Sequence, residues 1–232
     1  MSARTWRQLL VWLHVVSSVS WMSQAAALAV LLFTAIGPGA PPVRVGAATS
    51  AELLDTTLLV YSANIATATG LLLAATTSWG FWLHRWVAIK LLLTTGQLYL
   101  GIGVLSPRMD TMVATVSAGG TEGVAWLGLA ATLMASAFAA QVWLSVAKPG
   151  GRTRRAAGVR RPGTAPAWLF ALAVLAPVTE TVLGVTLTGP LPVLSLVVLI
   201  VAVALRTRER RSVPGPGQEL TSAQRPPATS RA

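Results

Sequence analysis

The chain has 232 residues, of which 53% are hydrophobic and 11% are charged, and its mean hydropathy is +0.64. So few charges cannot cover the surface of a soluble protein, and so many apolar residues exceed one ordinary core. The net charge is +11, but the basic segments lack the interleaved aromatic residues that stack on bases. The chain contains no cysteine, which excludes disulfides, thiolate metal sites and thiol nucleophiles. The composition indicates a membrane protein and argues against a nucleic-acid-binding one.

Six apolar stretches predict the fold class, an all-α polytopic transmembrane helical bundle of about six spans without a soluble domain. A span needs about 20 apolar residues, and the first four stretches meet that length. Gly189 and Pro190 divide the last two stretches, which predicts a helical hairpin; the alternative is one long tilted helix from Trp168 onward. The stretches cover residues 8–36, 53–77, 84–105, 123–146, 166–187 and 189–205.

The connections between these stretches are short, so residues 1–205 are expected to form one transmembrane helical domain. Residues 37–42 are mostly proline and glycine, which break helix geometry, and this connection is predicted to be a loop. After residue 205 the chain is rich in proline, glycine and arginine and poor in apolar residues. This composition predicts a disordered basic cytoplasmic tail over residues 206–232.

Basic residues alternate between the two sides of the predicted membrane. Sixteen of the 18 lysine and arginine residues lie before the first stretch, near the start of the third, in the fourth connection or after the last. The exceptions are Arg44 and Arg108, whose side also carries Glu52, Asp110 and Glu122. Basic segments stay in the cytoplasm and attract anionic lipids. We therefore expect a multi-pass protein of the bacterial plasma (inner) membrane, with both termini cytoplasmic and anionic lipid contacting that face.

Two stripes of polar and aromatic residues run along the first and third stretches at helical spacing. His14 and Lys90 each stand about 9 Å from the cytoplasmic boundary at 1.5 Å per residue. This matched depth predicts that they face each other or share an anionic ligand. In the alternative, Lys90 extends to the boundary along its aliphatic stem, and His14 bonds a serine or a backbone carbonyl. The stripes hold His14, Ser17, Ser18 and Trp21, and Trp86, Lys90, Thr94, Gln97 and Gly101.

Glu180 lies in the fifth stretch, about 21 Å from the cytoplasmic boundary. An ionised carboxylate at that depth needs a partner or a proton. Asn64 of the second stretch, with Gln24 and Gln97, offers polar groups near the same level. Two interpretations stay open: a proton or cation step at Glu180, or a protonated carboxyl group that hydrogen-bonds between helices.

The two histidines raise the question of haem. His14 and His84 would both ligate one haem only if their imidazoles faced each other across the porphyrin. His84 stands at the membrane boundary, so a single ligand at His14 fits haem better. No group of residues has metal-ligand spacing. The sequence predicts no cofactor and no metal site, with haem at His14 as the alternative.

Two segments resemble a known family. Residues 13–21 read LHVVSSVSW, and residues 78–94 read SWGFWLHRWVAIKLLLT. They resemble a family of actinobacterial multi-pass membrane proteins with a domain of unknown function, over about residues 8–105. The resemblance implies a helical integral membrane fold and carries no activity with it.

A more distant similarity is to the membrane protoporphyrinogen oxidase of the haem pathway. That family has a first-helix histidine seven residues before a tryptophan and a lysine on a later helix, which correspond to His14, Trp21 and Lys90. The similarity implies a tetrapyrrole site at these residues. The chain departs from the family after the tryptophan, where Met22, Ser23 and the residues that follow replace a Pro-Arg-Leu segment.

Together these features predict a non-enzymatic membrane component that binds lipid, a hydrophobic small molecule or partner helices. The first alternative is a haem-binding redox protein or tetrapyrrole oxidase that uses His14 and Lys90. The second is a small proton- or cation-coupled transporter centred on Glu180. The candidate intramembrane polar site comprises His14, Trp21, Asn64, Lys90, Gln97 and Glu180.

Overall fold

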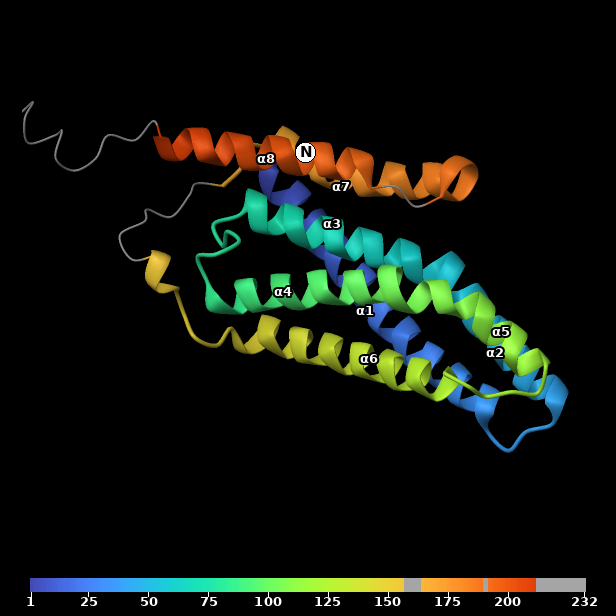
Figure 1. Cartoon of the computed structure of the whole chain (residues 1–232). Coiled ribbons are helices and arrows are strands. Elements are labelled where there is room, and N and C mark those ends of the chain that lie inside the picture. Colours follow the sequence, from blue (N-terminus) through green and yellow to red (C-terminus); the bar gives the residue numbers. More distant parts are fainter. Residues whose placement is uncertain (157–163, 190–191, 212–232) are drawn as a thin grey trace, which may run out of the picture.

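The computed structural model of the chain describes residues 1–156, 164–189 and 192–211. In this part the chain forms helices joined by short turns, and its only β-type pairing is an isolated bridge between His84 and Arg152 (Figure 1). The predicted all-α class is therefore confirmed. The helices are α1 (Ala3–Ile36), α2 (Pro41–Leu53), α3 (Val60–Thr76), α4 (Arg85–Leu100), α5 (Met109–Ser117), α6 (Val124–Ala147), α7 (Ala167–Leu183) and α8 (Val193–Arg211).

Five helical segments among the described residues are long and apolar enough to cross a membrane. Two of them join elements through π-helical turns: α2 continues into α3, and α4 continues through Gly101–Leu105 and a 3-10 turn into α5. The outward surface is apolar, as at Leu133, Val146 and Leu187, which are 66%, 80% and 73% exposed. Such a surface is typical of contact with lipid rather than water. The five segments are Ala3–Ile36, Pro41–Thr76, Arg85–Ser117, Val124–Ala147 and Ala167–Leu187.

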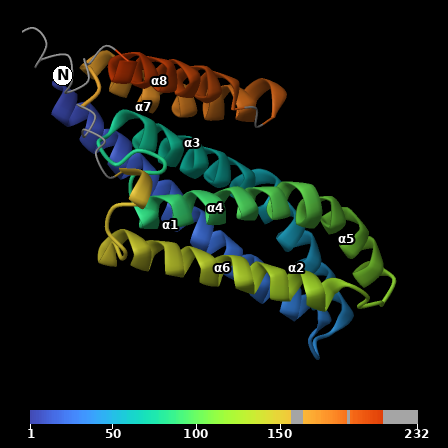
Figure 2. The same cartoon turned by 60° about the vertical axis from the view of Figure 1, so that its left-hand side comes forward.

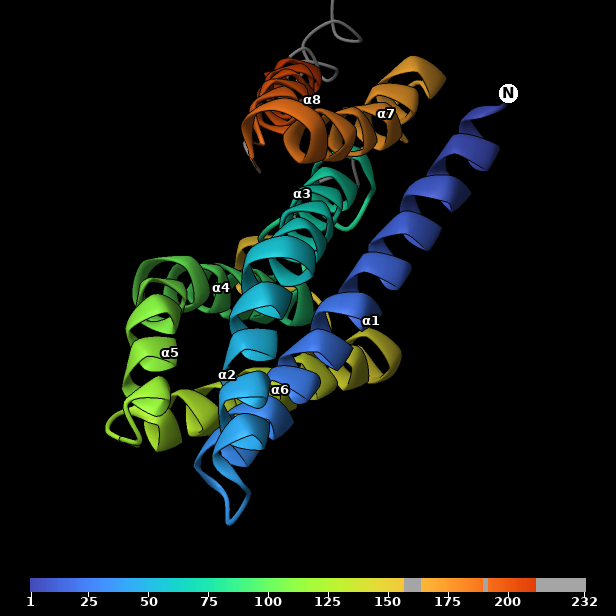
Figure 3. The same ribbon diagram turned by 90° about the vertical axis from the view of Figure 1, so that its right-hand side faces the viewer.

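Helix α1 makes the most extensive contacts of the bundle. It packs against α6, α3, α2 and α7. Helices α7 and α8 pair with each other and pack together on α3, whereas α4 contacts α6 and α3 (Figure 3). Two large clusters of buried apolar residues result. One joins α1, α2, α5 and α6 around Leu32 and Met109, and the other joins α1, α3, α7 and α8 around Leu10 and Phe170.

The last two apolar stretches form two helices rather than one. Helix α7 continues through the π-helical turn Gly184–Thr188, and α8 then runs back beside it. The structure therefore has the helical hairpin and not the single long helix. Helix α8 extends to Arg211, past the predicted start of the tail. The prediction is thus wrong for residues 206–211, while residues 212–232 lie outside the described part of the chain.

Helix also replaces the last two residues of one predicted loop, which was expected over residues 37–42. Residues 37–40 form the connection after α1, but α2 begins at Pro41. Proline is compatible with the first turn of a helix because the backbone N–H that it lacks has no intrahelical partner there. Pro107 likewise lies at the start of a helical turn, the 3-10 turn Ser106–Arg108 that leads into α5. Helices α2 and α5 pack side by side at the end of the bundle away from the N-terminus (Figure 1).

The opposite end of the bundle gathers the N-terminus, the α3–α4 connection and the residues after α6 (Figure 2). The backbone N–H of Arg85 donates to Gly151 at 3.2 Å, and that of Thr153 donates to Leu83 at 3.0 Å. Arg206 Nε donates to the Ala75 carbonyl at 3.0 Å, at the C-terminal end of α3. These hydrogen bonds tie connections that are distant in the sequence to one end of the bundle, which carries most of the basic residues.

Candidate functional site

Polar side chains inside the bundle lie along two helix contacts. We call these the α1–α3 seam and the α4–α6 seam. Hydrogen bonds within each seam satisfy groups that lipid cannot solvate. The α1–α3 seam comprises His14, Ser20, Gln24, Ser62 and Thr69, and the α4–α6 seam comprises Lys90, Thr94, Gln97, Gln141 and Ser145.

Helix α3 holds the His14 ring in the α1–α3 seam. Nδ1 lies 3.1 Å from the Ala66 carbonyl oxygen and 3.1 Å from Thr69 Oγ1. A carbonyl only accepts, so we assign the Nδ1 hydrogen to the bond with Ala66, which leaves the lone pair of the neutral ring on Nε2. Nε2 makes no hydrogen bond with a described residue. The ring is therefore oriented by one nitrogen and keeps the other available.

Gly70 makes room for this ring. A Cβ atom at Gly70 would lie 3.0 Å from His14 Cε1, closer than an ordinary van der Waals contact. We expect Gly70→Leu to displace the imidazole and break its bond to Ala66, at a cost of about 1–3 kcal/mol for the buried polar groups left unpaired. Thermal unfolding in detergent measures the loss. The matched control is Gly96→Leu, because nothing lies within 4 Å of a Cβ at Gly96. Equal unfolding temperatures for the two variants would contradict this role of Gly70.

The second level of the α1–α3 seam joins Ser20, Gln24 and Ser62. Gln24 Nε2 donates to Ser20 Oγ at 2.7 Å and to Ser62 Oγ at 3.0 Å. The hydroxyl of Ser62 in turn lies 3.3 Å from Gln24 Oε1. Gln24, which the sequence analysis placed near Glu180, thus finds its partners on the contact between α1 and α3.

The α4–α6 seam forms a continuous ladder. Lys90 Nζ donates to Ser145 Oγ at 2.7 Å, and Thr94 Oγ1 donates to Gln141 Oε1 at 2.9 Å. Gln141 Nε2 donates to Gln97 Oε1, and Gln97 Nε2 donates to the backbone carbonyl of Met134, two turns earlier on α6, at 3.0 Å. Gln97 and Gln141 are buried, with 6% and 5% of their surface exposed. The polar stripe predicted on α4 is therefore one helix face, and that face packs on α6.

Trp21 lies between the two seams. It is 3% exposed, and its ring centroid is 4.3 Å from that of Phe138 on α6. The indole packs in a small apolar cluster with Ala63 and Ala66 of α3. This contact links α1, α3 and α6 at one level.

The predicted pairing of His14 with Lys90 requires a correction. His14 hydrogen-bonds α3, and Lys90 hydrogen-bonds α6. Each residue has its own helix partner, and the bond of His14 to the Ala66 carbonyl is the alternative that the sequence analysis gave for this ring. The reason is that α1 packs mainly on α6 and α3, and α4 packs mainly on α6. Ser145 and Thr69, which the sequence analysis did not include, supply the missing partners.

Glu180 finds its partner on the neighbouring helix of the hairpin. Its Oε1 accepts from the backbone N–H of Ser195 at 2.9 Å, and its other carboxylate oxygen accepts from the Ser195 hydroxyl. Ser195 is the third residue of α8, where backbone N–H groups have no intrahelical acceptor. A carboxyl group at a helix N-terminus satisfies these donors and complements the helix dipole. Glu180 therefore caps α8.

Asn64 lies near Glu180 but on another helix. Tyr61 and Asn64 of α3 line a cavity of about 10 Å³ together with Pro177, Glu180 and Thr181 of α7. That volume is about the size of one water probe. Of the six candidate residues, Asn64 and Glu180 share this cavity, while the other four belong to the seams or to the contact between them.

His84 lies at the basic end of the bundle, away from the seams. Its Nδ1 lies 2.9 Å from the Trp79 carbonyl, and its ring is 5.0 Å from the Trp79 ring. Lys148 Nζ stands over the same indole at 5.3 Å. This cluster holds the α3–α4 connection. The described part of the chain contains no group of three or more His, Asp or Glu side chains placed to hold a metal ion.

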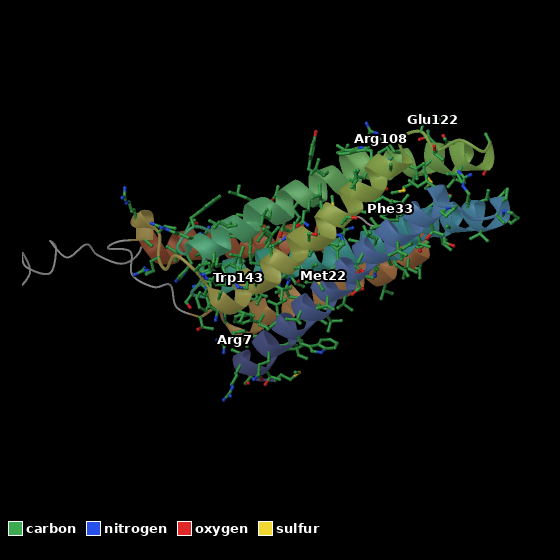
Figure 4. The ribbon with its side chains drawn as sticks, turned by 90° about the horizontal axis from the view of Figure 1, so that it is seen from below. Arg7, Met22, Phe33, Arg108, Glu122 and Trp143 are labelled. Atoms are coloured by element: carbon green, nitrogen blue, oxygen red, sulfur yellow. The ribbon has the colours of Figure 1, made fainter. Side chains whose placement is uncertain are left out.

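A large apolar groove lies between α1 and α6, at the end of the bundle opposite the N-terminus. Its volume is about 770 Å³, and it extends along α1 from Ala26 to the loop at Gly37–Gly39. Phe33, which Figure 4 labels at this face, forms part of the wall. The groove hydroxyls are satisfied within their own helices: Thr34 donates to Val30 at 2.8 Å, and Thr132 and Ser136 donate to the preceding turn of α6 at 2.8 and 2.9 Å. The wall therefore offers contact to apolar groups and no unpaired hydroxyl donor.

Small residues on α6 create the groove. Ala135 lines it, and Phe33 packs directly on Gly128, where an added Cβ would lie 3.0 Å from Phe33 Cζ. Small residues at helical spacing are typical of a face that packs closely on another helix. The structure divides that face between packing on Phe33 and the wall of the groove.

Comparison with known proteins adds no relative: no family model matches the chain, and neither a curated protein nor a solved structure matches it.

Proposed function

We propose that this chain is a non-enzymatic membrane component that binds a hydrophobic molecule, such as a lipid acyl chain, in the α1–α6 groove. The observation that supports this proposal most directly is the groove itself. Its volume of about 770 Å³ falls within the range of about 300–1,000 Å³ that ligand sites occupy. Its hydroxyl groups bond to their own helices, so an apolar occupant loses no hydrogen bond on entering.

Photo-crosslinking tests this function. A phosphatidylcholine with a photoactivatable acyl chain is added to the purified protein in neutral detergent, and cross-linked peptides are identified by mass spectrometry. We expect cross-links in α1 between Ala26 and Gly37 and in α6 between Thr132 and Ser136. Ala135→Phe should fill the groove and reduce these cross-links by about tenfold, as for a loss of about 1.4 kcal/mol of binding energy.

The matched control is Leu133→Phe, which places the same ring on the same helix at a position that is 66% exposed and does not line the groove. It should leave the cross-links unchanged. If both phenylalanine variants retain full cross-linking, the groove is not the binding site.

The same proposal includes six membrane spans with both termini in the cytoplasm. The supporting observations are the basic asymmetry of the sequence and the position of the N-terminus, the residues after α6 and the end of α8 at one end of the bundle (Figure 2). A reporter that works only in the cytoplasm should be active when it is fused after Arg211, and a reporter that works only outside the cell should be inactive there. Activity only of an external reporter would overturn this orientation.

A second candidate is a haem or tetrapyrrole site at His14, which the resemblance to the membrane protoporphyrinogen oxidase suggests. The favouring observation is that His14 Nδ1 bonds a backbone carbonyl and leaves Nε2 available. Histidine ligands of metals are oriented in this way. Lys90 would act there only through its charge, because its ammonium group is bonded to Ser145. The absorption spectrum of the purified protein, alone and after addition of haem, tests this candidate. A Soret band that disappears in His14→Ala supports it. A spectrum without a Soret band rejects haem.

A further inference from the structure

Arg44 stands at the end of the groove, on α2. A Cβ atom placed on Gly39, which lines the groove, would lie 3.8 Å from Arg44 Cγ. The aliphatic stem of the arginine thus flanks the loop that closes the groove. Arg44 and Arg108 are the two basic residues on this side of the membrane in the predicted topology, and Arg44 is the one beside the groove.

Two hydrogen bonds fix the Arg44 guanidinium and leave part of it unused. Nε donates to the Ala35 carbonyl at 2.9 Å, and Nη2 donates to the Gly120 carbonyl at 3.4 Å. A guanidinium group carries five N–H donors, so donors on Nη1 remain. Arg44 forms no ion pair with a described residue, including Glu122 in the same connection as Gly120. A positive charge in a fixed position therefore stands beside an apolar groove, and no described carboxylate forms an ion pair with it.

This combination matches one class of membrane molecule. Arginine binds phosphate oxygens through paired, charge-assisted hydrogen bonds. A phospholipid carries its phosphate at the membrane surface and its acyl chains toward the centre, and the order from Arg44 through Gly39 to Ala26 follows the same direction. The groove is about 16 Å long from Ala26 to Gly37 at 1.5 Å per residue, so it takes part of one chain. A headgroup with an amine would bring a second positive charge toward the guanidinium, whereas an anionic headgroup would not.

We propose that the α1–α6 groove binds an anionic phospholipid, with one acyl chain along α1 and α6 and the phosphate on Arg44. This inference rests on the proposed function, because it specifies the occupant of the same groove. It differs from the general attraction of anionic lipids to the basic cytoplasmic end, since Arg44 lies at the other end of the bundle.

The test compares two photoactivatable lipids with identical chains, phosphatidylglycerol and phosphatidylcholine, by their cross-links to the groove segments of α1 and α6. Reading only these peptides excludes lipid bound at the basic end. One charge near the membrane surface contributes about 1 kcal/mol, which corresponds to an approximately fivefold preference for phosphatidylglycerol. Arg44→Gln should abolish the preference and retain the cross-links of phosphatidylcholine. Arg44→Lys should keep most of the preference, and Arg108→Gln, the matched control, should keep all of it.

Further variants separate the two proposals. Glu122→Gln removes a negative charge near Gly120 without changing Arg44, so it should increase the preference; this measurement applies even if Arg44→Gln fails to fold. An unchanged preference in both Arg44→Gln and Glu122→Gln rejects the anionic phospholipid and leaves the groove as an apolar site. Unchanged cross-linking in Ala135→Phe rejects the groove itself. Inorganic phosphate should not compete, and competition by phosphate alone would show that the anion, not the lipid, is bound.

Discussion

Replacement of Gln141 by leucine is expected to destabilise the bundle by about 1–2 kcal/mol, because it leaves buried polar groups of α4 without partners. Gln141 accepts from Thr94 and donates to Gln97, whose side chain is 6% exposed. Thermal unfolding in detergent measures the effect. The control is Ser136→Ala on the same helix, whose hydroxyl bonds only its own backbone and whose loss should change stability by less than about 0.5 kcal/mol.

The double variant Gln97→Leu/Gln141→Leu tests whether the two side-chain amides interact. It removes both ends of the buried amide contact, and two apolar side chains can replace the pair at little cost. We expect the double variant to lose about 1 kcal/mol less stability than the two single variants lose together. Strict additivity would show that the two amides do not interact in the membrane protein.

Loss of the Glu180 carboxyl group is expected to loosen the α7–α8 hairpin. Glu180→Ala removes the acceptor for the Ser195 N–H and hydroxyl, and the loss of such a helix cap costs about 0.5–2 kcal/mol. Glu180→Gln should cost less, because the amide oxygen still accepts from the Ser195 backbone. Unfolding temperatures of the two variants test this order.

Two further variants control the measurement at Glu180. Ser195→Ala keeps the backbone bond and loses only the hydroxyl, so its effect should fall below that of Glu180→Ala. Thr179→Ala changes the exposed neighbour and should have no effect. If Glu180→Gln destabilises as much as Glu180→Ala, the negative charge itself holds the hairpin. That result would also favour a cation or proton role for Glu180 over a neutral cap.

The sequence predicted helix faces better than helix partners. Lys90, Thr94 and Gln97 recur at intervals of four and three residues, and this spacing places them on one face of any helix. Which helix that face meets depends on the packing of the bundle, and spacing within one helix contains no information about it. Matched depth therefore suggested His14 as the partner of Lys90, whereas the structure places Ser145 there. Ser145 lies four residues after Gln141, a spacing that marks a polar face on α6 as well.

Local chemistry explains the other differences. The prolines at positions 41 and 42 suggested a loop, but proline at a helix start preorganises the first turn. Glu180 and Ser195 are 15 residues apart, and only the turn of the hairpin brings the carboxyl group to the start of α8. The groove arises where small side chains of α6 face α1, which is a tertiary feature. The sequence identified Arg44 as one of two basic residues on the non-cytoplasmic side. Its position beside the groove could be seen only in the folded chain.

The central position of α1 determines the order in which the bundle can be assembled. Ribosomes make α1 first, yet its polar groups need Ser62 and Thr69 of α3, and its largest contact, with α6, begins only at Val124. In the proposed membrane topology, a newly inserted α1 exposes His14 and Gln24 to lipid or to the insertion machinery until later helices are synthesised. Because unpaired polar groups are costly in lipid, we expect α1 to leave the insertion machinery only together with α3. Truncated chains that end before Val60 should then cross-link to the insertion machinery for longer than chains that extend past Thr76.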